Sequence, residues 1–225
     1  MIETMGTSAV LTLHDQTLFL LPERAVFWEE EQMLIVADPH FGKPQIFRDK
    51  GIPVPEGTTA DDLQRLSLLL KRYDPIRILF LGDLVHGRFE NTERFDELIH
   101  QWRRLHHQTQ VFLVTGNHDR RAGKLLPPFR IDRIDEKLAF KPFVFSHKPN
   151  FDTSHYGIAG HVHPAVTVSG KGRQKETLPC FCFGPHGVLL PSFGSFTGSQ
   201  VIRPSREDTV FVIAGDEVFG MTHSG

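Results

Sequence analysis

The stretch VFLVTGNHDRR, residues 111–121, runs from four apolar residues through Thr and Gly into an amide, an imidazole and a carboxylate. The apolar run is typical of a buried strand. Loops at strand ends can hold reactive groups on a rigid sheet while leaving them open to solvent and substrate. We therefore interpret this stretch as a strand that ends in a functional loop.

Polar clusters of this kind occur at five points of the chain, and each follows or interrupts an apolar run. They are DPH at 38–40, GDLVHGR at 82–88, GNHD at 116–119, SHKP at 146–149 and GHVH at 160–163. Side chains two apart on an extended segment point the same way, so Asp38 with His40, and His161 with His163, can each present two ligands to one point. In three clusters a glycine, at position 82, 116 or 160, precedes the ligands and permits a tight turn.

The clusters supply seven nitrogen or oxygen donors, which is more than one tetrahedral ion uses. The donors are Asp38, His40, Asp83, Asn117, His147, His161 and His163. Two divalent ions about 3.5 to 4 Å apart would use such a set, with a bridging carboxylate and a bridging hydroxide that attacks phosphorus in line with the leaving group. Because the set lacks thiolates, it favours manganese, with iron or zinc as alternatives, over a structural zinc site.

The order of apolar runs predicts an α/β fold with two packed mixed β-sheets flanked by helices. Strands are expected at 9–13, 17–21, 25–28, 33–37, 76–83, 110–119, 143–147, 156–160, 165–169, 176–183, 187–190, 208–213 and 216–221. Helices are expected at 58–75, with Thr58 or Thr59 as N-cap, and at 91–107. Strands and helices alternate in the middle of the chain, which indicates crossover connections. The segment SGKGRQKE, 169–176, is expected to be an exposed turn.

Length and composition predict one domain over residues 1–225 in a soluble cytoplasmic protein. The 225 residues are 40% hydrophobic, which is enough for one sizeable core, and the net charge is −2. The chain is therefore not basic overall, and any nucleic-acid contact needs a local patch. No apolar run approaches the roughly 18 residues of a membrane span. Cys180 and Cys182, the only cysteines, are expected to be reduced core thiols.

The five clusters, in this order, resemble the calcineurin-like metallophosphoesterases, whose pattern is D-x-H, GD, GNH[DE], a lone H and GHxH. A narrower resemblance, to the ligase-associated DNA damage response endonucleases, extends almost end to end. It is carried by LIVADPHFGK at 34–43, LGDLVHGR at 81–88, AGHVHPAV at 159–166, LPCFCFGP at 178–185 and LPSFGSFTG at 190–198. Pro39 stands where that pattern has leucine, which affects the local backbone and leaves both neighbouring donors in place.

The resemblance implies the αββα sandwich of the superfamily and assigns a role to each site residue. It implies that Asp38, His40 and His163 hold the first metal, that Asn117, His147 and His161 hold the second, and that Asp83 bridges them. His118 then has no metal to bind and is expected to stabilise the transferring phosphoryl group or protonate the leaving oxygen, with Asp119 orienting its ring. His86 and Arg88 are secondary candidates for phosphate binding.

The roles predict a binuclear phosphodiesterase. The narrower resemblance implies that it acts on single-stranded or structured DNA in repair, with DNA ligase and helicase as partners, and a homodimer is one expected assembly. The basic side chains expected to follow the phosphate backbone are Lys43, Arg48, Lys50, Arg120, Arg121, Lys124 and Lys148. Two alternative functions are compatible with the same sequence. One is hydrolysis of a nucleotide or other small phosphate ester, and the other is a non-catalytic scaffold. The second is disfavoured because scaffolds tend to lose ligands, and every ligand is present here.

Overall fold

The computed structural model describes residues 7–54, 57–87, 92–169 and 175–221. Its helices are α1 (Lys43–Asp49), α2 (Thr58–Tyr73), α3 (Glu93–Leu105) and α4 (Asp119–Ala122), with two 3-10 turns, η1 (Gly123–Leu125) and η2 (Pro127–Phe129). In this part of the chain no helix is both long enough and apolar enough to cross a membrane.

Within the described residues, the first sheet has seven strands in the order of the sequence. They are β1 (Ala9–Leu13), β2 (Gln16–Leu21), β3 (Ala25–Trp28), β4 (Met33–Ala37), β5 (Arg77–Leu81), β6 (Gln110–Val114) and β7 (Arg133–Asp135). Strands β1 to β4 are antiparallel neighbours joined by short turns, whereas β4 to β7 are parallel. The parallel half needs crossover connections, which α2 and α3 supply.

The second sheet is also mixed and runs in the order β14-β11-β12-β13-β10-β9-β8, with β15 and β16 attached through β12. Its strands are β8 (Lys137–Phe140), β9 (Phe143–Ser146), β10 (Tyr156–Ala159), β11 (Pro164–Ser169), β12 (Lys175–Gly184), β13 (Gly187–Leu189), β14 (Gln200–Val201), β15 (Thr209–Ala214) and β16 (Glu217–Met221). Strands β9, β10 and β13 are parallel to one another. Each sheet therefore contains a parallel group whose strands end at one edge.

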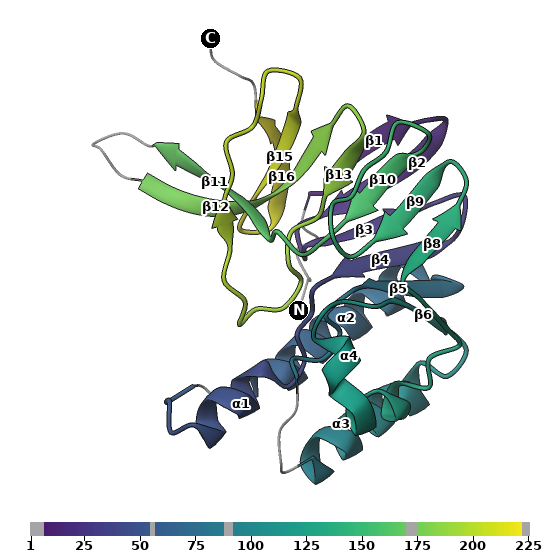
Figure 1. The fold of residues 1–225 in the computed structure, drawn as a ribbon, viewed down its shortest axis with the longest axis vertical. Coiled ribbons are helices and arrows are strands. Elements are labelled where there is room, and N and C mark those ends of the chain that lie inside the picture. Colours follow the sequence, from purple (N-terminus) through teal and green to yellow (C-terminus); the bar gives the residue numbers. More distant parts are fainter. Residues whose placement is uncertain (1–6, 55–56, 88–91, 170–174, 222–225) are drawn as a thin grey trace.

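The two sheets pack face to face, and helices cover the first sheet (Figure 1). One apolar core lies between the sheets and contains Trp28, Phe143, Phe145 and Phe181, all fully buried. A second core joins the other face of the first sheet to α2 and α3 through residues such as Trp102. Figure 1 shows α1 to α4 gathered on one side and β11, β12, β15 and β16 at the far end. The predicted architecture of two mixed sheets with flanking helices is confirmed.

Several short elements were not expected from the sequence, namely α1, α4, β7, β8, β14 and the two 3-10 turns. The α1 segment KPQIFRD has no helical stripe of apolar residues, and it begins after Gly42, which has a φ of 80°. The three-residue β7 and four-residue β8 are held by pairing with β6 and β9. Short elements of this kind form because tertiary neighbours complete them, and their own pattern is too weak to predict.

The start of α2 corrects one prediction. Its N-cap is Gly57, with a φ of 89°, and no side chain caps the helix. Oγ1 of Thr59 instead accepts a hydrogen bond from the backbone N–H of Gly42, at 3.3 Å. The expected turn at 169–176 falls largely on residues 170–174, which lie outside the described residues.

Candidate metal centre

All seven predicted ligands follow parallel strands that end at one place in the fold. Asp38 and His40 follow β4, Asp83 follows β5, and Asn117 follows β6 in the first sheet. His147 follows β9, and the pair at 161 and 163 follows β10, in the second sheet. Because the carboxyl ends of parallel strands share an edge, the packed sheets bring these loops together.

Five of the seven predicted ligands have a left-handed backbone, which is uncommon for residues other than glycine. Their φ angles are 49° at Asp38, 48° at His40, 47° at Asp83, 67° at His161 and 52° at His163. Such conformations cost of order 1 to 3 kcal/mol each and cluster at functional sites, where the surrounding structure enforces them. Here they turn the chain sharply after each strand and aim the side chains at the shared edge.

Two glycines allow the loops to approach one another closely. Gly82 has a φ of 80°, and a Cβ at this position would overlap the imidazole of His147. A Cβ on Gly116 would overlap the carboxylate of Asp83. The prediction that these glycines permit close backbone approach is confirmed.

The first ligand set consists of Asp38, His40 and His163, whose donor atoms lie within 4.8 Å of one another. Nε2 of His163 is 3.5 Å from Oδ1 of Asp38. Nδ1 of His163 contacts the carbonyl oxygen of Gly198 at 2.9 Å. A carbonyl can only accept, so Nδ1 carries a proton and the neutral ring presents the lone pair of Nε2 to the site.

The second set consists of Asp83, His147 and His161, also within 4.8 Å, and Asn117 lies beside it. Nε2 of His147 is 3.0 Å from Nδ1 of His161, 3.2 Å from Oδ1 of Asn117 and 3.6 Å from Oδ2 of Asp83. Nδ1 of the same ring faces the carbonyl oxygen of Leu81 at 3.5 Å, which directs Nε2 inward as an acceptor. Several lone pairs thus point at one small volume.

Asp83, a member of the second set, also faces His40 of the first set. Its Oδ2 is 3.8 Å from Nε2 of His40 and 3.6 Å from Nε2 of His147. Its Oδ1 accepts a hydrogen bond from the backbone N–H of His118 at 2.8 Å, which fixes the plane of the carboxylate. One oxygen of Asp83 is therefore free to face both sets.

A buried oxygen without a hydrogen-bond partner marks the site as one for cations. Asp38 is fully buried, and its Oδ2 accepts the backbone N–H of His161 at 2.7 Å. Its Oδ1 is buried and has no hydrogen-bond partner among the described residues. An unsatisfied buried carboxylate oxygen is costly, and a metal ion is one way to satisfy it. The residues present thus fit one divalent ion in each set.

The pKa values of the imidazoles agree with this interpretation. Burial and the neighbouring imidazoles lower the pKa of His40 to about 2, so the ring is neutral and able to bind a metal near neutral pH. Burial alone would lower the pKa of His163, but the carboxylate of Asp38, whose Oδ1 lies 3.5 Å from Nε2 of His163, raises it. The position beside Asp38 therefore favours a positive charge.

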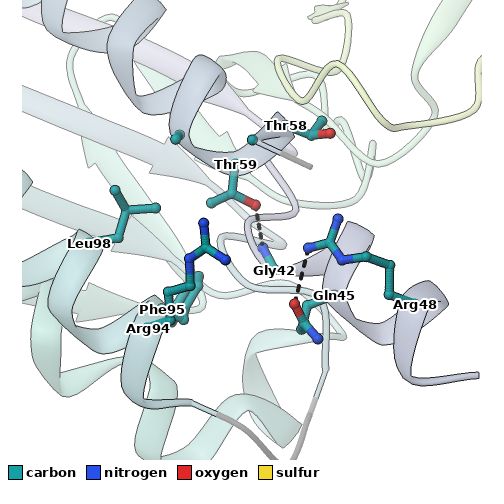
Figure 2. Close-up of a pocket in the computed structure, with 10 residues that line it drawn as sticks. Gly42, Gln45, Arg48, Thr58, Thr59, Arg94, Phe95 and Leu98 are labelled. Carbon is teal, nitrogen blue, oxygen red and sulfur yellow. Dashed lines mark hydrogen bonds between the residues drawn. The ribbon is translucent and has the colours of Figure 1, made fainter. Parts of the chain in front are cut away.

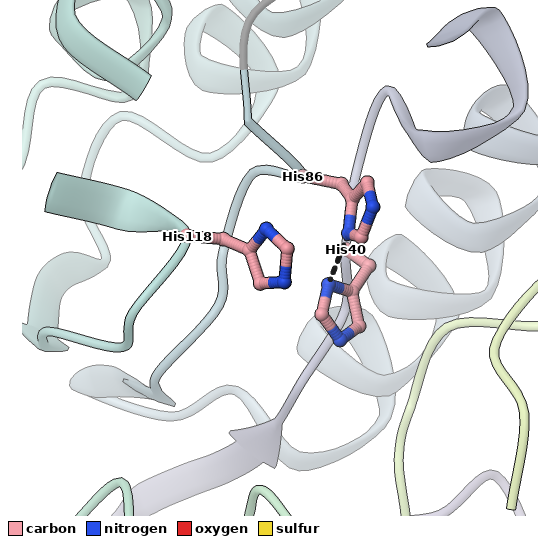
Figure 3. Close-up of side chains that lie close together, drawn as sticks. All are labelled: His40, His86 and His118. Atoms are coloured by element: carbon pink, nitrogen blue, oxygen red, sulfur yellow. Dashed lines mark hydrogen bonds between the residues drawn. The ribbon is translucent and has the colours of Figure 1, made fainter. Parts of the chain in front are cut away.

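A third cluster, drawn in Figure 3, joins His40 to His86 and His118. Nδ1 of His86 is 3.0 Å from Nδ1 of His40, and the rings of His86 and His118 are stacked with centroids 4.1 Å apart. Burial, then the neighbouring His118, lowers the pKa of His86 to about 4. Nε2 of His118 is 3.9 Å from Oδ2 of Asp83, and a third of this side chain is exposed. His118 thus borders the ligands and faces solvent.

Asp119 connects two of the loops. Its Oδ2 accepts the backbone N–H of Gly116 at 2.8 Å, and its Oδ1 accepts that of Val85 at 3.2 Å. These bonds fix the loop after β5 to the loop after β6. The expected role in orienting the His118 ring stays a prediction. Arg88, the remaining candidate, lies outside the described residues.

A cavity of about 390 Å³ lies beside the loop that follows His40 (Figure 2). Its lining includes Gly42, the guanidinium groups of Arg48 on α1 and Arg94 on α3, and the start of α2. Arg48 is one of the basic residues singled out in the sequence. Arg94 is not, because in the sequence it is one charged residue of an amphipathic helix, and the packing of α3 brings it to the cavity.

The sequence model of the calcineurin-like phosphoesterases matches residues 32–215. Among solved structures, the Pseudomonas putida nuclease MPE is similar with a TM-score of 0.82 and 33% identity, over 96% of this chain and 100% of that one. A protein of unknown function from Aquifex aeolicus has a TM-score of 0.40 and 21% identity, over 63% of this chain and 82% of that one. Yfce, a phosphoesterase from E. coli, has a TM-score of 0.41 and 12% identity, over 81% and 87%.

A comparison with curated proteins returned no match. The match to the family model covers well over half of the chain, and it includes all five polar clusters. The donor sets at the sheet edge are those that a metal-dependent phosphoesterase needs. The chain belongs to the calcineurin-like phosphoesterase family and is a metal-dependent phosphoesterase.

Proposed function

We propose that this protein is a binuclear phosphodiesterase that cleaves DNA and uses two divalent ions, manganese by preference. The observation that carries the binuclear part is the position of Asp83 Oδ2 between Nε2 of His40 and Nε2 of His147, at 3.8 and 3.6 Å. In this assignment, which agrees with the two ligand sets, Asp38, His40 and His163 hold one ion, and Asn117, His147 and His161 hold the other.

Two bound divalent ions would supply an activated water nucleophile and would stabilise charge on the phosphoryl oxygens. The protein's own residues set up the surroundings for this reaction. If His40 binds through Nε2, its Nδ1 carries a proton and donates to Nδ1 of His86. The neutral His86 ring then carries its remaining proton on Nε2, where it can donate to a phosphate oxygen.

His118 is the residue placed to act on the leaving group. Its backbone N–H is bound to Asp83 Oδ1, its ring is stacked on His86, and the ring remains partly exposed. A side chain fixed beside the ligands and open on one side can protonate a departing alkoxide oxygen. We propose this role for His118, with Asp119 keeping its loop in place.

Two observations support a nucleic acid as the substrate, and the narrower resemblance of the sequence motifs favours DNA. The relative with 33% identity over nearly the whole chain is described as a nuclease. The cavity with Arg48 and Arg94 is lined by Gly42, two residues after His40, and its guanidinium groups suit a further phosphate of a polynucleotide. A substrate with several phosphates can use this cavity, whereas a small ester has no second phosphate to place in it.

The test compares substrates with one preparation of the full chain. Chelator-treated protein is given Mn²⁺ and then hairpin, nicked or single-stranded DNA, cyclic nucleotides, or a nitrophenyl phosphodiester. We expect DNA cleavage that depends on Mn²⁺, and no cleavage by an Asp83→Ala preparation, which controls for contaminating nucleases. Hydrolysis of small esters with no cleavage of any DNA would contradict the DNA assignment and favour the small-ester alternative.

A further inference from the structure

The segment 192–198, with the sequence SFGSFTG, lies against the backbone of the Asp38 loop. Oγ of Ser192 donates to the carbonyl oxygen of Asp38 at 2.8 Å, and the N–H of Phe193 donates to that of Ala37 at 2.8 Å. A Cβ on Gly194 would overlap the carbonyl group of Pro39, so the two backbones are as close as they can be. This segment therefore fixes where Asp38 leaves its strand.

The same segment also orients His163, the member of the first ligand set that is most distant from Asp38 in the sequence. The carbonyl oxygen of Gly198 accepts the Nδ1 proton of His163 at 2.9 Å, which leaves Nε2 free to bind a metal. Hydrogen bonds of this kind set the tautomer and the orientation of ligating histidines. One seven-residue segment thus controls both Asp38 and His163.

Two side chains of α2 hold this segment in turn. Asp62, only 4% exposed, accepts the N–H of Ser195 through both carboxylate oxygens at 3.2 Å. Nη2 of Arg65 donates to Oδ1 of Asp62 at 3.0 Å and to the carbonyl oxygen of Phe193. Its Cζ lies 4.2 Å from the centroid of the fully buried Phe193 ring. The pair therefore makes four contacts with two residues of the segment.

Stability alone is a poor reason for an ion pair at this place. Burial raises the pKa of Asp62, opposed by the charge of Arg65, so removing water from the carboxylate is costly. Apolar residues of similar size often stabilise a protein as well as a buried ion pair does. Apolar side chains could not, however, accept a hydrogen bond from the N–H of Ser195 or donate one to the carbonyl oxygen of Phe193. What the pair adds is a fixed position for the segment.

We propose that Asp62 and Arg65 are positioning residues for the metal site formed by Asp38 and His163, and that they act through residues 192–198. This inference rests on the proposed binuclear site. Removing the side chain of Asp62 or of Arg65 should weaken the binding of the ion held by Asp38 and His163. We expect a loss of about 10- to 100-fold, the range seen when a hydrogen-bond partner outside the ligands is removed. The ion held by His147 and His161 should keep most of its affinity, because the segment contacts neither ring and reaches this set only through Asp38, whose Oδ2 accepts the N–H of His161.

The experiment measures Mn²⁺ binding by the full chain in calorimetric titrations, together with the electron paramagnetic resonance signal of coupled Mn²⁺ pairs. The variants are Asp62→Ala, Arg65→Lys and the double variant Asp62→Leu with Arg65→Met, which leaves no unpaired buried charge. Asp61→Ala and Lys71→Ala, exposed on the same helix, are the matched controls. We expect one weakened binding step and loss of the coupled signal in the three variants, least in Arg65→Lys, and normal binding in the controls.

The other outcomes contradict either the positioning role of Asp62 and Arg65 or the proposed binuclear site. Two normal binding steps in folded variants would overturn the positioning role and leave the binuclear site standing. Variants that no longer fold, the apolar double variant included, would make the pair purely structural and would also overturn it. Wild-type protein that binds no Mn²⁺, or only one ion, would instead contradict the proposed function itself.

Discussion

The chemistry of individual side chains at this site depends on which nitrogen of each ring carries a proton. Carbonyl groups of Leu81 and Gly198 bind Nδ1 of His147 and His163, and Nδ1 of His86 faces His40. In each case the other nitrogen of the ligand ring is turned toward the site. The proposed ligand geometry is thus set by backbone oxygens and a neighbouring imidazole as much as by the ligands.

His118→Ala tests the residue that borders the ligands without belonging to either proposed set. We expect the variant to keep both ions and to cleave DNA about 10² to 10⁴ times more slowly, the usual span for a positioned general acid. The loss on a nitrophenyl phosphodiester should be much smaller, because nitrophenolate leaves without a proton. Metal content and turnover on both substrates are measured with the same preparations, and His100→Ala, exposed on α3, is the control. Equal losses on both substrates would favour phosphate binding over proton donation.

The arrangement of helices and strands makes features that single motifs do not contain. The cavity between α1, α2 and α3 exists because α3 packs beside the start of α2 and brings Arg94 to face Arg48 (Figure 2). Strand β12 places Cys180 and Cys182 two residues apart in a core with Val210 and Val212. Each arrangement gives a separate prediction.

Arg94→Ala should weaken the use of DNA without affecting a small ester. The guanidinium is exposed, so its removal should leave folding unchanged, raise KM for DNA several-fold and reduce the salt slope of DNA binding by about one. Turnover of a nitrophenyl phosphodiester should not change. The matched control is Arg104→Ala, exposed near the other end of the same helix. Equal KM values for DNA in wild type and Arg94→Ala would show that DNA does not bind in this cavity.

The two cysteines should be unreactive in the native protein. Burial, then the neighbouring Cys182, raises the pKa of Cys180 to about 12, and burial, then Asp208, raises that of Cys182 to about 11. A raised thiol pKa leaves very little thiolate below pH 9, and thiolate is the reactive form. A thiol-specific disulfide reagent at pH 8 should therefore label neither cysteine until denaturant is added, when both should react. Rapid labelling of folded protein would show that β12 is more open than described.

Across the whole molecule, the sequence predicts what depends on local patterns. The strands that end in polar clusters, the flanking helices α2 and α3, and the two mixed sheets are all found. The glycines at 82 and 116 are placed for close approach, as predicted. These features share one cause, because each is encoded by residues that are adjacent in the chain: an apolar run, a glycine and a ligand.

Features built from distant segments could not be predicted in the same way. The contacts from Asp62 and Arg65 to residues 192–198 join parts of the chain more than 120 residues apart, and the charged residues lie within an otherwise ordinary amphipathic helix. Arg94 enters the cavity only through the packing of α3. Asp119 was expected to serve His118, and its bonds to Gly116 and Val85 depend on how two loops meet. A single sequence does not show which distant residues meet in this way.

In the proposed mechanism two ions share Asp83, and DNA cleavage needs both. The most direct measurement titrates Mn²⁺ into the chelator-treated protein while following hairpin cleavage and bound metal in the same samples. We predict no cleavage without metal and full activity only as binding approaches two ions per chain, with Asp83→Ala inactive at every Mn²⁺ concentration. Full cleavage in excess chelator, or activity that saturates at one bound ion, would contradict the account.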